Sequence, residues 1–480
     1  MVESKTLPSA PPASLTAVSL VAAAALFMLI LDGAILNTSL PQVAKGLGVG
    51  PVEMNLGITA YILTVAIFTP ISAWVADRFG AKIIFVIAIG IFTAASVGCA
   101  LANSLPTFVA ARVVQGVGGA ILSPIGRIIV LRSANPSELM RATSTLTWPA
   151  LIAPVIGPVI GGAITSFFGW RWNFFLNVPI GLAGIAFALA IVPDTGERVR
   201  RPLDAVGTAL TASALFLLIS GLGRLGDGSS LTQSVGMFLA GGALAGAAII
   251  WLRRHAHPLL RLEALKLPTF ATSALSAGSL SVMATNATPF LLPLMMQAAW
   301  GFSPLRAGEW LMFYFLGNLL MKAITTQVLR RWGFRSVMAA TGLWIGASIA
   351  AFGLLRPTLP QALLALALLL AGAARSMQLT ALNTLAFADV PGHQRSSSST
   401  LLSMLQQLSM AIGIAVAAVT LNLAKAMHGG GVLRQSDFQW AFLVCGAAGA
   451  VGGLICLRLE PAAGAEVSGH KLRAIPSPTA

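Results

Sequence analysis

Long apolar stretches separated by short polar loops run through almost the whole chain. A helix needs roughly 20 residues to cross the apolar core of a bilayer, and each stretch is about that long. Fourteen spans are predicted, and we place them at 15–40, 54–75, 82–102, 106–131, 141–167, 173–193, 203–223, 232–252, 270–295, 306–329, 336–355, 360–385, 398–424 and 438–457. We therefore expect an all-α polytopic membrane protein, because helices satisfy every backbone hydrogen bond inside lipid.

The composition supports a membrane protein and argues against a soluble protein that binds nucleic acid. Hydrophobic residues make up 56% of the chain and charged residues 9%, whereas soluble domains carry about 25% charged residues. A net charge of +15 would point to nucleic acid as the partner of a soluble protein. Here the basic residues lie in loops between apolar stretches, where they set topology and attract anionic lipid. We predict the lipid bilayer as a partner and no nucleic acid.

The distribution of positive charge predicts the orientation of the chain. With the amino terminus inside, the inner loops hold most of the basic residues, among them Arg78, Lys82, Arg132, Arg141, Arg253, Arg254, Arg330 and Arg331. The outer loops hold fewer, such as Lys45, Arg171 and Arg306. Because positive charge accumulates on the cytoplasmic side and the number of spans is even, both termini are expected in the cytoplasm. The first span is too long for a signal peptide and should remain as a helix.

Sequence motifs of enzymes and metal sites are absent from the chain. Cys99, Cys445 and Cys456 lie in apolar stretches without metal-ligand spacing, so we expect buried thiols, no disulfide and no metal. No phosphate-binding loop, zinc-protease helix or serine-nucleophile turn occurs. We therefore predict that the protein is not an enzyme and uses no cofactor.

Two similar segments indicate an internal repeat. Residues 75–82 close the second span and residues 329–335 close the tenth, with a shared pattern of basic residues around Gly80 and Gly333. If the seventh and eighth spans are an insertion, both segments occupy equivalent places in two six-helix halves, as in secondary transporters. The predicted units are a disordered tail 1–14, a first half 15–193, two additional helices 194–257, a second half 258–458 and a disordered cytoplasmic tail 459–480.

Asp32 is the acid that lies deep inside a predicted span. A charged side chain there costs at least roughly 2.5–3.5 kcal/mol on insertion scales, which makes Asp32 a functional candidate for loading and releasing a proton. Arg112, inside the fourth span, is its natural partner, because a guanidinium keeps its charge. Two alternatives stay open: Asp32 has a permanent structural partner, or Arg112 reaches outward to the membrane surface. Glu309, near the outer end of the tenth span, is the second choice of proton carrier.

Five motifs in the expected order carry a resemblance to a known family. They are residues 31–41, the loop around Asp77, residues 112–120, residues 157–162 and residues 170–179. The chain resembles the major facilitator superfamily, and within it the fourteen-helix drug:proton antiporters, along nearly its whole length. Four positions depart from the motifs of this family: Ala73, Ala81, Ser144 and Ala153. Further segments resemble a bacterial group of multidrug resistance proteins.

The resemblance implies roles for three groups of residues. Asp32 and Arg112 would couple transport to protons. Asp77, Arg78, Gly80 and Lys82 would form a conformational gate, with Asp77 pairing across the two halves when the inner side is shut; the alternative is an ordinary solvated turn. Gly157, Pro158, Gly161 and Gly162 would form a pliable, closely packed hinge; the alternative is ordinary helix packing. Polar candidates for a central cavity are Asn37, Gln115, Asn286, Gln297, Arg375 and Gln378; for the uncharged ones the alternative is hydrogen bonding between helices.

The expected function is proton-coupled export of a small molecule, of the multidrug efflux type, by a monomer in the bacterial inner membrane. Arg127, Lys322 and Arg375 lie toward the inner part of the bundle and favour an alternative substrate, an anionic metabolite or a metal chelate such as that of an organic acid. Outward snorkelling would equally explain Arg127 and Lys322. The same spans would also suit a passive facilitator or a sensor that does not transport.

Overall fold

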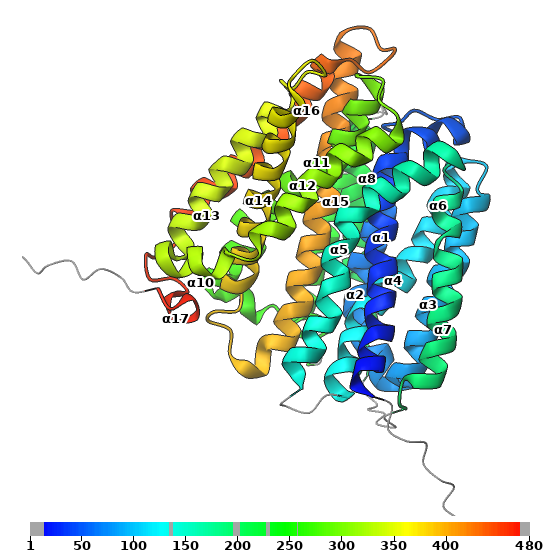
Figure 1. Cartoon of the computed structure of the whole chain (residues 1–480). Helices are drawn as coiled ribbons and strands as arrows, with labels where there is room; N and C mark the ends of the chain where they lie inside the picture. The colour runs from blue at the N-terminus through cyan, green and yellow to red at the C-terminus, as the bar shows by residue number, and fades with distance from the viewer. Residues whose placement is uncertain (1–13, 134–137, 195–201, 227–230, 257, 471–480) are drawn as a thin grey trace, which may run out of the picture.

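The computed structural model describes residues 14–133, 138–194, 202–226, 231–256 and 258–470, and these residues form a bundle of helices without strands (Figure 1). The first part of the chain forms α1 (Leu15–Leu47), α2 (Asn55–Phe79), α3 (Ala81–Leu101), α4 (Leu105–Ser133), α5 (Leu139–Phe167), α6 (Trp172–Phe175) and α7 (Asn177–Ile191). Two helices follow, α8 (Ala205–Gly226) and α9 (Leu231–Arg254). The last part forms η1 (Glu263–Lys266), α10 (Pro268–Ala274), α11 (Ala277–Ala298), α12 (Pro304–Met321), α13 (Thr325–Phe352), α14 (Gln361–Leu385), η2 (Gly392–Gln394), α15 (Arg395–Met427), α16 (Gln435–Cys456) and α17 (Ala465–Ser468).

Thirteen helical segments among the described residues are long and apolar enough to cross a membrane. The remaining expected span corresponds to α12, which carries Arg306, Glu309 and Asn318 and is therefore less apolar than the others. Because α12 packs lengthwise against α5 and α14 inside the bundle, it completes the fourteen-helix arrangement. The sequence prediction of a polytopic all-α fold is confirmed.

Several helix boundaries differ from the sequence prediction. The sixth expected span is divided into α6 and α7 at Leu176, and the ninth is divided into α10 and α11. The tenth expected span continues to residue 329, but α12 ends at Met321 and the following residues begin α13. Gly333 interrupts α13 with a φ of 72°, as Gly80 separates α2 from α3 with a φ of 96°. Glycine tolerates this left-handed conformation, so the internal repeat is visible at the backbone level.

The described ends of the chain lie at the same end of the bundle, called here the termini end (Figure 1). The expectation of a disordered tail from residue 459 is wrong for its first part, because α17 forms and packs against α13. His470 also hydrogen-bonds through Nδ1 to the carbonyl of Arg330 at 3.0 Å. Residues 1–13 and 471–480, which make up the rest of the two expected tails, lie outside the described residues.

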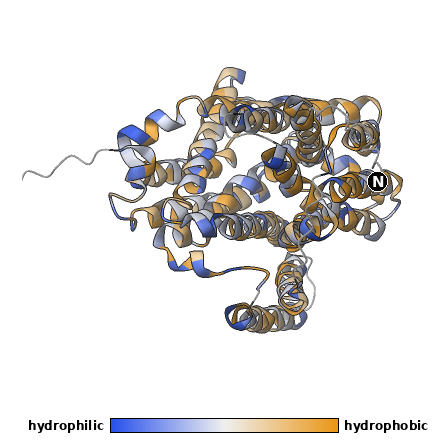
Figure 2. Cartoon of the chain, turned by 90° about the horizontal axis from the view of Figure 1, so that it is seen from below, coloured by the Kyte–Doolittle hydropathy of each residue, from blue (hydrophilic) through white to orange (hydrophobic). Residues whose placement is uncertain are grey.

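The α8–α9 hairpin stands beside the main body, as Figure 2 shows from below. Asp204, just before α8, holds its base together. The carboxylate accepts hydrogen bonds from the amide of Gly207 (2.8 Å), the indole of Trp251 (2.9 Å) and the amide of Leu259 (3.1 Å). These contacts join the start of α8, the end of α9 and the segment leading to α10. The sequence prediction does not single out Asp204.

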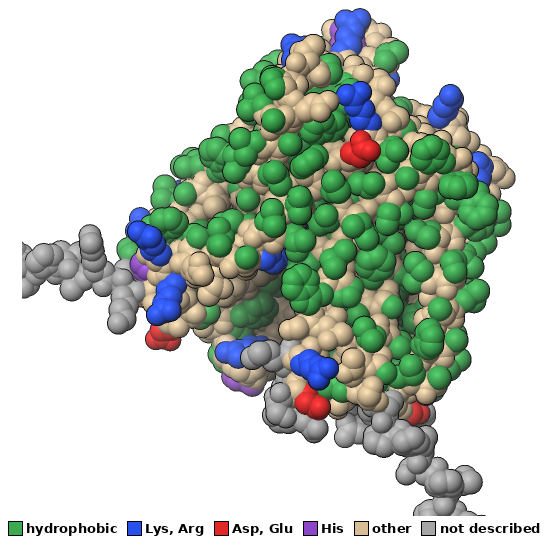
Figure 3. Space-filling view, in the orientation of Figure 1, with side chains coloured by type: hydrophobic (Ala, Val, Ile, Leu, Met, Phe, Trp, Pro, Cys, Tyr) green, Lys and Arg blue, Asp and Glu red, His purple; other side chains and the backbone are tan. Residues whose placement is uncertain are grey.

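The surface has the charge distribution of a protein that spans a bilayer. Hydrophobic side chains cover the middle of the face shown in Figure 3, while lysines, arginines and acids gather toward its upper and lower ends. Large exposed apolar residues such as Phe187, Leu239 and Leu366 lie on long helices, where lipid would cover them. The three cysteines are buried, as predicted.

Candidate functional site

A buried ion pair joins α1 to α4. Arg112 Nη1 lies 2.7 Å from Asp32 Oδ2, and the side chains are only 1% and 2% exposed. Arg112 also donates from Nε to the carbonyl of Gly57 at 3.5 Å and lies over the ring of Tyr61, with 4.2 Å between the guanidinium carbon and the ring centroid. The predicted pairing of Asp32 and Arg112 is therefore present in the fold, and α2 also contacts Arg112.

Three uncharged residues complete the surroundings of Asp32. Gln115 Nε2 and Asn177 Nδ2 donate to Asp32 Oδ1 at 3.0 and 2.8 Å. Both amides also donate to Ser96 Oγ, at 2.9 and 3.2 Å, and Gln115 Oε1 accepts from Arg112. Hydrogen bonds to an ionised group are about twice as strong as neutral ones, so this network stabilises the carboxylate. The sequence analysis did not name Ser96 and Asn177 as site candidates, although Asn177 lies in the motif of residues 170–179.

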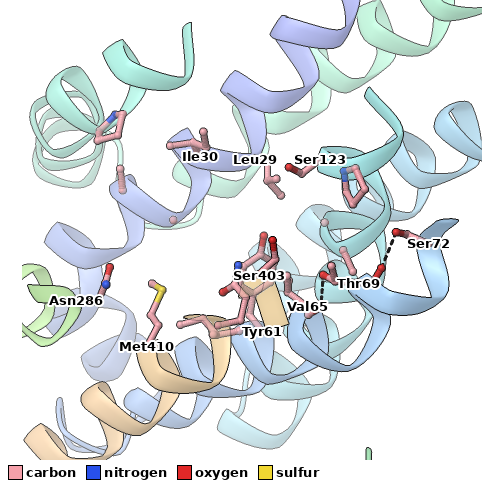
Figure 4. Close-up of a pocket in the computed structure, with 18 of the residues that line it drawn as sticks. Leu29, Ile30, Tyr61, Val65, Thr69, Ser72, Ser123, Asn286, Ser403 and Met410 are labelled. Carbon is pink, nitrogen blue, oxygen red and sulfur yellow. Dashed lines mark hydrogen bonds between the residues drawn. The ribbon is translucent and has the colours of Figure 1, made fainter. Parts of the chain in front are cut away.

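A cavity of about 650 Å³ lies between the two halves. It runs from Ile58 and Arg112 to Leu131 and Ser396, which lie next to the loops at the termini end. Figure 4 shows Tyr61 and Ser123 from the first half and Asn286 and Ser403 from the second half among the residues that line it. Arg112 borders this cavity and Asp32 does not, so Arg112 is the member of the ion pair that lies next to the cavity.

The opposite end of the bundle is closed by contacts between the halves. Gln42 Nε2 on α1 donates to Gln297 Oε1 on α11 at 2.9 Å, and Gln297 Nε2 donates to the carbonyl of Thr38 at 2.8 Å. The helices α5 and α12 also pack tightly together. The cavity therefore reaches the termini end and is sealed from the far end.

Only half of the polar residues predicted to line a cavity do so. Asn37, Asn286 and Arg375 line it. Gln115, Gln297 and Gln378 are not among its lining residues and follow the alternative of hydrogen bonding between helices. Gln115 bonds to Asp32, Gln297 to the carbonyl of Thr38, and Gln378 to Thr341 and Ser281. Sequence alone does not show which side of a helix faces the space between the halves.

The remaining charged candidates occupy different surroundings. Glu309 is exposed on α12, away from the cavity, so the structure does not bring the second choice of proton carrier to Asp32. Arg127 lines the cavity, but Lys322 does not and instead donates to Thr380 Oγ1 at 3.2 Å.

The four residues expected to form a gate surround the turn between α2 and α3. Asp77 pairs with Arg132 at the end of α4, at 3.3 Å, within the same half. Arg78 lies over the ring of Trp74, and Lys82 Nζ donates to the carbonyl of Leu189 at 2.8 Å. In this conformation, which leaves the termini end open, Asp77 thus has a partner in its own half.

The glycines of the expected hinge lie where helices approach most closely. A Cβ on Gly157 would lie 2.6 Å from Ala34 Cβ, and one on Gly161 would lie 2.8 Å from Ile35 Cα. A Cβ on Gly162 would lie 2.7 Å from Leu305 Cα, so α5 touches α1 on one side and α12 on the other. Pro149, Pro154 and Pro158 all lie inside α5. Each proline removes one helix hydrogen bond, which loosens this helix at the seam between the halves.

A family model decides the classification of this bundle. The model for the major facilitator superfamily matches residues 22–413 and 274–477. The chain belongs to the major facilitator superfamily. Members of this superfamily are membrane transporters, so the candidate site is part of a transport protein.

Individual relatives and structures agree with this family. The chain is 36% identical to the multidrug resistance protein MdtD of Salmonella newport over 407 residues, covering 84% of this chain and 85% of the relative. A crystal structure of the peptide transporter POT in complex with sulfate has a TM-score of 0.70, at 16% identity, covering 94% of both chains. The crystal structure of a D-xylose-proton symporter has a TM-score of 0.67, at 14% identity, covering 93% of this chain and 98% of that one. These structural similarities show the fold of this superfamily transporter.

Proposed function

We propose that this protein is a proton-coupled antiporter that exports a small molecule across the bacterial inner membrane. It would act as a monomer with both termini in the cytoplasm. The similarity to MdtD, which is named for multidrug resistance, supports an efflux role. The observation that carries the proposal is the place of Arg112, which borders the cavity and pairs with the buried Asp32.

The geometry suggests how protons and substrate exchange. In this conformation Asp32 accepts hydrogen bonds from three donors, an arrangement suited to the ionised, proton-free carboxylate. Protonation of Asp32 from the outside removes its charge and frees Arg112, and we expect this to favour return of the cavity to the cytoplasmic end. Release of the proton inward then restores the ion pair and accompanies substrate capture.

We expect the gate and hinge residues to move during the same transport cycle. Asp77 would leave Arg132 and bond across the halves when the cytoplasmic end closes, with Arg78, Gly80 and Lys82 shaping the turn that carries it. Gly157, Pro158, Gly161 and Gly162 would let α5 bend while α1 and α12 remain in close contact. Interfaces of this kind switch between discrete arrangements.

The test is export by the purified protein in liposomes with an interior pH dye and an imposed proton gradient. The panel contains lipophilic cations and organic anions. D32N should lose export against a concentration gradient while keeping substrate binding and exchange. The control is E309Q, which removes an exposed carboxylate outside the cavity and should export normally.

Two results would contradict the proposal. Uphill export that is unchanged in D32N would remove Asp32 from proton coupling. Transport that is only downhill, with no proton movement in the wild type, would identify a passive facilitator.

A further inference from the structure

The second half of the protein repeats the ion-pair site of the first half with one change. An arginine is followed three residues later by a glutamine on both α4 and α14: Arg112 with Gln115, and Arg375 with Gln378. Each arginine lies over a tyrosine, Tyr61 on α2 and Tyr314 on α12. Each glutamine bonds to a hydroxyl of the neighbouring helix, Ser96 on α3 and Thr341 on α13. The two sites are therefore structurally related.

The change concerns the partner of the arginine. Asp32 of α1 faces Arg112, but Asn286 of α11 faces Arg375. The contact from Arg375 Nη2 to Asn286 Oδ1 is 3.4 Å long, against 2.7 Å for Arg112 and Asp32, and an amide carries no charge. Arg375 Nε is buried and has no hydrogen-bond partner. The second site thus contains an arginine without the carboxylate that balances the first.

The cavity has the corresponding excess of positive charge. Arg112, Arg127 and Arg375 line it, and no aspartate or glutamate is among its lining residues in the described part of the chain. Arg112 is neutralised by Asp32, which leaves the charges of Arg127 and Arg375 unbalanced. A water-filled cavity with apolar walls and one sign of charge concentrates ions of the opposite sign.

We propose that Arg375 and Asn286 form a subsite that binds the anionic group of the transported substrate. A carboxylate or phosphate oxygen would take the place beside Arg375 that Asp32 takes beside Arg112, and would satisfy the free Nε donor. Phe315, Pro289 and Ile414 line the cavity nearby and would receive an apolar body. The substrate class is therefore amphiphilic organic anions. This inference rests on the proposed transport function and specifies its substrate.

The test is binding of 2-naphthoate to the full-length protein in nanodiscs, measured by equilibrium dialysis. Inorganic phosphate serves as a competitor and tetraphenylphosphonium as a cationic probe. R375Q should weaken 2-naphthoate binding about tenfold or more, because it removes a charge-assisted hydrogen bond. N286D should weaken it as much, since an internal carboxylate would then pair with Arg375. The control is R356Q, which removes an exposed cation outside the cavity lining and should bind normally.

The outcomes separate the subsite from the transport function. Strong binding of 2-naphthoate that R375Q and N286D both weaken would support the subsite, and competition by phosphate would show that the anionic charge is what is recognised. Absence of 2-naphthoate binding, or equal binding in wild type and R375Q, would overturn the subsite. Proton-driven export of tetraphenylphosphonium in the same preparation would then leave the antiporter standing. Conversely, binding of 2-naphthoate that is never coupled to protons would refute the antiporter but not the subsite.

Discussion

Arg112 and Asp32 form a 2.7 Å ion pair in which both side chains are shielded from solvent, and Arg112 borders the central cavity. Removing one member of a buried pair is more damaging than removing both, because it leaves an uncompensated group. The two members differ, however, because a carboxylate can become neutral by taking up a proton and a guanidinium cannot.

This difference predicts the stability of three variants. D32N leaves Arg112 charged and without its carboxylate, and we expect a loss of about 3 kcal/mol, the lower end of the range for broken buried pairs, because Gln115 and the carbonyl of Gly57 still accept hydrogen bonds from Arg112. R112Q should cost less, and the double variant D32N/R112Q should recover part of the loss. Thermal unfolding in detergent, followed by tryptophan fluorescence, measures the order. A double variant less stable than D32N alone would contradict this account of the pair.

The contact between α5 and α1 predicts an intolerance of added volume. G161A places a Cβ 2.8 Å from the Cα of Ile35, so the two helices must separate. We expect a loss of about 1–3 kcal/mol in stability together with a loss of export. The matched control is G242A on α9, where a Cβ meets nothing within 4 Å. Equal behaviour of the two variants in thermal unfolding would show that close packing at Gly161 is not required.

Asp204, at the base of the α8–α9 hairpin, should make the stability of the protein depend on pH. Burial alone would raise the pKa of Asp204, but hydrogen bonds from Trp251, Gly207 and Leu259 and the nearby His255 outweigh it and hold the pKa below its ordinary value. A carboxyl whose pKa is depressed in the folded state contributes stability above its unfolded pKa and loses it as the pH falls.

D204N should therefore unfold more easily than the wild type at pH 7, by about 1–3 kcal/mol. The difference should stay constant down to about pH 5 and shrink below about pH 4, where the wild-type carboxyl becomes protonated. Melting temperatures of both proteins across this range measure it. A difference that persists unchanged at the lowest pH would indicate that Asp204 acts by its shape and not by its charge.

The hydrogen bonds of Gln297 predict a shift between conformations. Q297L removes the bonds to Gln42 and Thr38 that close the far end. Two hydrogen bonds are worth about 1–3 kcal/mol in total, so the open form at the termini end should lose population. Labelling of a cysteine placed at Ser403, which lines the cavity, should become slower from the termini side. The native cysteines are buried and should not interfere. Unchanged labelling would show that these bonds do not hold the far end shut.

The amino-acid sequence alone predicts the all-α fold, because lipid forces each apolar stretch of about 20 residues to become a helix that satisfies its own backbone hydrogen bonds. It also determined Asp32 and Arg112 as candidates, since charges inside a span are costly and few. It did not determine where helices break, because Leu176 divides one predicted span and residues 275–276 divide another.

Helix packing selects which polar residues share a site. Gln115, Gln297 and Gln378 looked equivalent to Asn37 and Asn286 in the sequence, yet helix rotation placed the glutamines against other helices and the asparagines at the cavity. The spacing that relates Arg112 and Gln115 to Arg375 and Gln378 was present in the sequence. Its meaning depends on Asp32 and Asn286, which come from other helices. Contacts between helices far apart in the chain depend on how whole helix faces pack together. A single sequence shows which residues share a helix face, but it does not show which other helix packs against that face.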